Sequence, residues 1–117
     1  MPITSNLVQE TTTTTGTGNL TLSNVTGKVS FNTAFGNGSP TNVFYYFVSH
    51  RTIAEWEVGE GHMSAASTLV RDTILSSSNS NNAVNFSAGT MDVVSDLPAV
   101  KQINGLGEVL ALPYAFT

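Results

Sequence analysis

The sequence contains no cysteine, which excludes disulfide bridges and thiolate metal sites, so the fold must rest on its apolar core. Charge is scarce as well: four basic and eight acidic residues among 117 give a formal net charge of -4. Lys28, Arg51, Arg71 and Lys101 are scattered along the chain. Nucleic-acid binding needs clustered cations that displace counterions from phosphates, so we expect no nucleic-acid partner.

Long hydrophobic runs are missing too. A helix that crosses a bilayer needs ~18–20 consecutive apolar residues, whereas the longest apolar run here, residues 43–48, has the length of a strand. The sequence starts without a basic segment followed by an apolar run, so we expect no secretory signal and no membrane partner.

Neutral polar residues make up much of the composition. Thr, which favours strands, is abundant, and Ser, Asn and ten Gly supply turn formers, while Lys and Gln, which favour helices, are few. Six Phe, three Tyr and one Trp argue against a disordered chain. The length suits a single domain, and the composition indicates short strands joined by tight loops.

Apolar and β-branched residues recur in short stretches separated by turn signals. Residues 42–49 predict a strand buried on both faces, with Phe44, Tyr46 and Val48 on one side. Further strands are predicted at 20–22, 29–31, 53–58, 68–75, 83–86 and 90–94, with helix as the competing interpretation for 68–75. The turn spacing predicts an all-β fold, an antiparallel β-sandwich or a small barrel.

Apolar and acidic residues alternate along residues 53–58, which predicts which side chains of this strand enter the core. The alternation predicts that Trp56 and Val58 point inward and that Glu55 and Glu57 point to solvent. Residues 59–61, Gly-Glu-Gly, predict a bulge or bend in this strand. The expected core anchors are Phe44, Tyr46, Trp56, Val58 and Phe86.

The two ends of the chain differ from its middle. Residues 1–18, with their run of threonines and two glycines, predict an extended N-terminal arm, residues 19–98 a β-sandwich domain, and residues 99–117 an apolar C-terminal segment. That segment is expected to be a last strand or a contact between subunits. The candidate inter-subunit contacts are Val8, Thr13, Val109, Leu110, Leu112, Tyr114 and Phe116.

Chemistry-bearing residues form no recognisable site. Ser49 and His50 are neighbours on a strand and point to opposite faces, so we interpret His50, like His62, as a surface or interface residue. The aspartates at 72, 92 and 96 match no calcium-loop spacing. We therefore predict a non-enzymatic protein with no catalytic residue, no metal and no cofactor.

Several segments taken together resemble a β-module of tailed-bacteriophage virion proteins, and they cover most of the chain. They are residues 8–18, 20–22, 25–27, 56–61, 69–79 and 84–93, which agree with that module in order and spacing. Residues 50–55 depart from the short turn usual in the module, and residues 101–117 lie outside it. The resemblance implies a component of a phage particle, made in the bacterial cytoplasm.

Two places in the particle remain open. The first is a capsid decoration (cement) protein on the outside of the virion, expected to be a homotrimer that binds the major capsid protein or neighbouring virion subunits. The alternative is a tail-fibre or baseplate module that contacts host glycan or another fibre subunit. The alternative predicts exposed aromatic residues in the loops at 36–40 or 76–82, and these loops contain none.

Overall fold

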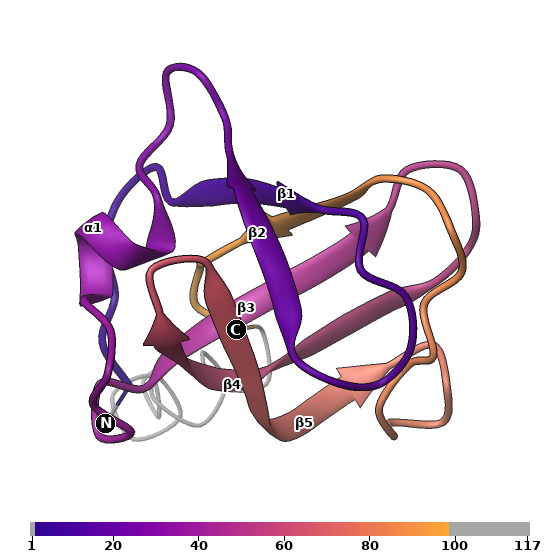
Figure 1. Cartoon of the computed structure of the whole chain (residues 1–117). Coiled ribbons are helices and arrows are strands. Elements are labelled where there is room, and N and C mark those ends of the chain that lie inside the picture. The colour runs from indigo at the N-terminus through magenta and orange to yellow at the C-terminus, as the bar shows by residue number, and fades with distance from the viewer. Residues whose placement is uncertain (1, 99–117) are drawn as a thin grey trace, which may run out of the picture.

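The computed structural model describes residues 2–98, which form six strands and one short helix (Figure 1). The elements are β1 (Gln9–Thr12), β2 (Leu20–Asn24), α1 (Phe31–Phe35), β3 (Phe44–His50), β4 (Trp56–Ala65), β5 (Thr68–Ser77) and β6 (Met91–Val94). No helix in this part of the chain is long and apolar enough to cross a membrane.

The strands close into a small antiparallel barrel in the order β1-β2-β5-β4-β3-β6. Every pairing between these strands is antiparallel, and β1 closes the ring because it pairs with β2 on one side and with β6 on the other. The prediction of an all-β antiparallel fold is confirmed, in its barrel form rather than as a sandwich. The strand at 68–75 is confirmed as β5, and the helical alternative is wrong.

The predicted N-terminal arm is wrong in its second half. Gln9–Thr12 is β1, paired with two neighbours, and Val8 just before it is buried in the core. Glu10 and Thr12 also point inward and are buried. Residues 9–12 therefore close the barrel, because without them β2 and β6 would each present an open edge.

The barrel interior is filled with large side chains. Phe44, Tyr46 and Phe86 lie in the core, where the sequence places them, whereas Val58 is only half-buried. The other members of the core cluster are Val8, Leu20, Leu22, Phe31, Phe35, Val48, Met63, Leu69, Val84, Met91 and Val93. A six-stranded barrel has room for little more than its own side chains, so this interior is a packed core.

The segment predicted as a strand at 29–31 leads into a helix. Ser30 is the N-cap of α1, and its hydroxyl accepts a hydrogen bond from the Thr33 amide at 3.0 Å. Phe31 and Phe35, four residues apart, fall on one face of the helix and are buried against Phe44, with ring centroids 5.1 and 4.6 Å away. The aromatic spacing is thus helical, and α1 plugs one end of the barrel (Figure 1).

The inward and outward side chains of β4 alternate in the opposite order to the prediction. Glu57, Gly59, Gly61 and Met63 point inward, while Trp56 is 41% exposed, so the prediction of an inward Trp56 and an outward Glu57 is wrong. The predicted irregularity is confirmed, because the β4–β5 register shifts at Val58/Gly59 and Glu60/Gly61.

The connections after β3 and after β5 gather at the barrel end opposite α1 (Figure 1). The strand predicted at 83–86 is absent there. Val84 and Phe86 are buried, but residues 83–86 form only an isolated bridge, between Phe86 and Gly16. This bridge fastens the β1–β2 connection to the β5–β6 connection.

The inward glycines of β4 give the first testable prediction. A Cβ at Gly59 would lie 2.4 Å from the Thr73 carbonyl oxygen and 2.6 Å from the Tyr46 hydroxyl. We expect Gly59→Ala to lower the free energy of unfolding by at least about 2 kcal/mol, measured by chemical denaturation.

Gly18→Ala is the matched control, because nothing lies within 4 Å of a Cβ at that position and its backbone conformation is open to any residue. Its stability should match that of the parent chain or exceed it slightly. Equal stabilities of the two variants would contradict the packing described here.

Candidate functional site

The most buried polar group in the barrel is an ion pair between β4 and β5. The Glu57 and Arg71 side chains are 0% and 3% exposed, and the guanidinium meets both carboxylate oxygens through Nε at 2.8 Å and through Nη2. The Tyr46 hydroxyl and the Val84 amide also donate to the carboxylate, at 2.6 and 2.8 Å. Four donors thus surround one buried carboxylate.

Arg71 extends this network to the loops at the barrel end. Its guanidinium donates to the carbonyl oxygens of Gly16, Gly18 and Val84, at 3.3, 3.2 and 2.9 Å. It also lies 5.3 Å from the centre of the Phe86 ring, within the range of a cation–π contact. One side chain therefore joins β5 to the β1–β2 and β5–β6 connections.

Tyr46 acts in this cluster as a hydrogen-bond donor. Burial, and then the neighbouring Glu57 carboxylate, raise the pKa of the Tyr46 hydroxyl far above its ordinary value. The phenol therefore keeps its proton. The inward faces of Gly59 and Gly61 leave the space that its ring occupies. The cluster resembles an acid–base pair in composition, but its polar atoms are engaged in structural hydrogen bonds.

Glu10 is a second buried carboxyl, on β1 next to α1. It is 2% exposed, and its Oε1 accepts the Phe31 amide hydrogen at 2.9 Å. Burial raises its pKa, and the bond from Phe31 offsets this only in part. Glu10 thus holds the start of α1 against the barrel wall.

His50 is buried, so the prediction of a surface or interface histidine is wrong for it. Its Nδ1 accepts the backbone amides of Thr52 and Ile53, both at 3.2 Å, and its Nε2 lies 3.0 Å from the Ala88 carbonyl oxygen. This geometry assigns the ring proton to Nε2. His50 therefore shapes the β3–β4 connection and fastens it to the segment before β6.

Two further pairs of charged or titratable groups lie nearer the surface. His62 bonds Asp72 at 2.7 Å, and Arg51 binds both carboxylate oxygens of Asp92. Among the described residues no cluster of three His, Asp or Glu could hold a metal ion. These pairs join neighbouring segments and do not converge on a common point.

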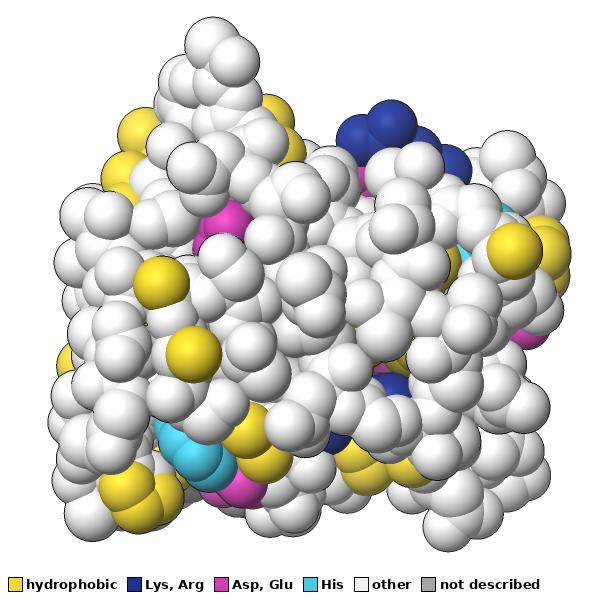
Figure 2. Space-filling view, in the orientation of Figure 1, with side chains coloured by type: hydrophobic (Ala, Val, Ile, Leu, Met, Phe, Trp, Pro, Cys, Tyr) yellow, Lys and Arg dark blue, Asp and Glu magenta, His cyan; other side chains and the backbone are white. Residues whose placement is uncertain are grey.

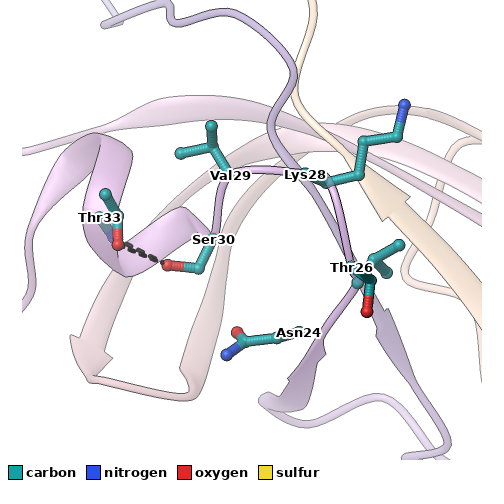
Figure 3. Close-up of a pocket in the computed structure, with 7 residues that line it drawn as sticks. Asn24, Thr26, Lys28, Val29, Ser30 and Thr33 are labelled. Atoms are coloured by element: carbon teal, nitrogen blue, oxygen red, sulfur yellow. Dashed lines mark hydrogen bonds between the residues drawn. The ribbon is translucent and has the colours of Figure 1, made fainter.

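Two surface features remain as candidate binding surfaces. The first is the surface around Leu7, an exposed apolar residue whose carbonyl accepts the amide of Val29. Val29 in turn lines a hollow of about 440 Å³ between the β2–α1 connection and α1. Figure 3 shows the Ser30 hydroxyl turned toward Thr33, to which it donates at 2.9 Å, while the Lys28 side chain points away from the hollow. The hollow is lined by residues 24–26, 28–30 and 33.

Leu7 is the unusual residue of this surface. It is 66% exposed, and its backbone has φ 58°, a left-handed conformation that disfavours a branched side chain. The conformation is held from both sides, because the Val29 amide donates to the Leu7 carbonyl at 2.9 Å and the Gln9 amide donates to the Val29 carbonyl at 3.1 Å. The fold thus fixes an apolar side chain in solvent at a cost in backbone energy.

The second surface surrounds Trp56 at the other end of the barrel. The Trp56 amide donates to Ser78 Oγ and its carbonyl accepts the Ser78 amide, both at 3.0 Å, so its neighbour is the loop at 76–82. A separate hollow of about 280 Å³ lies at this end of the barrel, lined by Ala54, Glu55, Ser78, Asn79, Val84 and Asn85. The loop has no aromatic residue of its own, but β4 supplies one beside it.

The predicted contact residues are only partly described. Val8 is buried, so it is not available to a partner in this structure, whereas Thr13 is exposed. Val109, Leu110, Leu112, Tyr114 and Phe116 lie outside the described residues.

The sequence analysis did not predict the roles of Leu7, Glu10 and the Glu57–Arg71 pair. Met63 is an apolar residue six positions after Glu57 on β4, so the two side chains lie on the same face of the strand. Placing Met63 in the core would therefore have predicted the inward Glu57.

Comparison with known proteins found no matching family model, no matching curated protein and no matching solved structure. The resemblance to the phage β-module therefore stays a prediction.

The buried ion pair gives a second testable prediction. We expect Arg71→Met to lower the free energy of unfolding by about 3–5 kcal/mol, because it leaves the Glu57 carboxylate buried without its counter-charge. The matched control is Arg51→Met, which breaks an exposed pair whose side chains are 53% and 34% accessible. Arg51→Met should lose no more than about 1 kcal/mol, when the unfolding free energies of both variants are measured by urea denaturation. Similar losses for both arginines would count against the structural role of Arg71.

Glu10 gives a prediction about pH. Its pKa is higher in the folded than in the unfolded chain, so the fold favours the protonated form, and stability from this group falls as pH rises through the two pKa values. We expect Glu10→Gln, which keeps an oxygen for the Phe31 amide, to be at least as stable as the parent at pH 7. Its advantage should shrink toward acid pH when thermal midpoints are compared. A deficit that is largest at neutral pH would contradict this account.

Proposed function

We propose that this protein is a non-enzymatic structural component of a bacteriophage particle, and specifically a capsid decoration protein. It would be made in the bacterial cytoplasm and sit on the outside of the shell. Its partners would be the major capsid protein or neighbouring virion subunits, with a homotrimer as the assembled form. The observation that carries the proposal is the exposed, strained Leu7 just before β1 of a closed barrel.

Leu7 supports an interface because its strained backbone costs free energy that no burial of its side chain offsets in the isolated barrel. A left-handed conformation costs a non-glycine residue about 1–2 kcal/mol, and 66% exposure of the side chain brings no compensating burial. A partner that covers Leu7 and Ile3 would supply that burial. The hollow beside α1 offers hydroxyl and amide groups for the polar rim of such a contact.

The barrel itself suits crowding among many copies. Its closed ring leaves no strand edge of the barrel open to pair with a neighbouring chain. Figure 2 shows a face made mostly of uncharged side chains and backbone, with a few scattered charged groups. Such a surface can be brought close to neighbours with little cost of desolvating ions. The histidine and acidic groups described above are used to hold loops together, which supports a non-enzymatic role.

A test of this proposal uses particles with and without the protein. Particles that lack it should assemble and then release DNA at a lower temperature than complete particles, because they lose repeated interface contacts. Unchanged heat resistance of the deficient particles would refute the proposal.

The residue-level prediction concerns Leu7→Asn. Asn tolerates the left-handed conformation, so this variant should fold at least as stably as the parent chain. It should nevertheless bind deficient particles at least about tenfold more weakly, measured by occupancy after mixing with purified protein. Ile53→Asn is the control, because Ile53 is also exposed, at 44%, but lies at the opposite end of the barrel. Equal occupancy by Leu7→Asn and the parent would contradict the proposed contact surface.

A further inference from the structure

An apolar stripe crosses the outside of the barrel on three neighbouring strands. Phe47 of β3 pairs with Val58 of β4 on one side and with Val94 of β6 on the other. All three are half-buried and alternate with core residues along their strands, so their side chains point away from the barrel interior. We propose that this outer apolar stripe binds residues 109–116 of the same chain. The inference goes beyond the proposed particle function and concerns the free protein.

The stripe is a continuous surface that is separate from the core. Cross-strand neighbours on one face of a sheet lie about 4.5–5.5 Å apart at their Cβ atoms, so Val58, Phe47 and Val94 form one patch. Tyr45, which also points outward, is 2% exposed, so the patch continues along β3 into a region shielded from water. Contiguous apolar patches on the outside of a protein mark contact sites. Because β3 is already paired on both sides, the occupant must contact side chains.

The chain supplies a segment that matches this surface. Residues 109–116, Val-Leu-Ala-Leu-Pro-Tyr-Ala-Phe, contain no charged side chain, and the proline disfavours a helix. Every second residue is large and apolar: Leu110, Leu112, Tyr114 and Phe116. Bound in extended form, the segment would direct these four side chains to one face, because side chains alternate with a period of two. An uncharged face of this kind suits the uncharged stripe.

The length of the connection favours the same molecule over a second copy. Strand β6 ends at Val94, which belongs to the stripe, and the described part of the chain ends four residues later at Pro98. Residues 99–108 extend to at most about 33–36 Å, whereas Val94 and Val58 are two strand spacings apart, about 10 Å. The two glycines of this connection permit the chain to reverse. An intramolecular contact also has an effective concentration in the millimolar range.

The test is crosslinking within the full chain, which has no cysteine of its own. One variant combines Val58→Cys with Leu112→Cys, and it is treated at low protein concentration with a short bis-maleimide crosslinker. The matched control combines Ser23→Cys with Leu112→Cys, because Ser23 is exposed on β2, which lies opposite β3 in the ring. We expect the Val58 pair to crosslink within one molecule at least about tenfold faster than the Ser23 pair. Phe47→Cys replaces Val58→Cys if the latter does not fold.

Two aspartates then test the contact itself. Adding Leu110→Asp to the Val58 pair should slow crosslinking at least about fivefold, because a charge would have to leave water at the stripe. Thr117→Asp adds the same charge just outside the segment and should leave the rate unchanged. Equal effects of the two aspartates would overturn the inference.

The crosslinked product distinguishes the occupants. Equal rates for the Val58 and Ser23 pairs would overturn the inference, because the segment would then have no preference for the stripe. A product at twice the mass of the chain would also overturn it, because a second copy would then be the occupant. The experiment uses no particles, so its failure would leave the proposed Leu7 contact with the shell untouched.

Discussion

The barrel depends on a charge that has been taken into its interior. Moving the Glu57 carboxylate out of water is costly, and the structure offsets that cost with Arg71, Tyr46 and the Val84 amide. A buried ion pair contributes little net stability. It does restrict the strand register, because any register that separates the partners leaves an unpaired charge inside the barrel. We therefore interpret the pair as the element that fixes how β4 faces its neighbours.

The orientation of β4 decides what reaches the surface. With Glu57 inward, Gly59 and Gly61 must also point inward, where they leave room for the Tyr46 ring, and Trp56 must point outward. The same cluster holds the β1–β2 and β5–β6 connections through Arg71, which shapes the loops beside Trp56. The exposure of Trp56 is thus a consequence of the internal ion pair.

The strand pattern was readable from sequence because turn signals and alternation are local properties. The central strand, the strand at 68–75 and the irregularity at the two glycines of β4 were all predicted, and the structure contains them. Three features were missed because they depend on distant partners. Glu57 points inward only because Arg71 meets it there, residues 9–12 form a strand only because β2 and β6 flank them, and Leu7 is strained only because Val29 holds it.

The closed, lightly charged barrel keeps the apolar side chain of Leu7 exposed at a cost in backbone energy. In the proposed role, Leu7 would face the shell, and the end of the barrel that carries Trp56 would face outward. The most direct measurement is the copy number of the protein in purified particles, by quantitative densitometry against the major capsid band. The account predicts a copy number comparable with that of the major capsid subunit. A copy number of only a few per particle, as expected for a tail component, would contradict it.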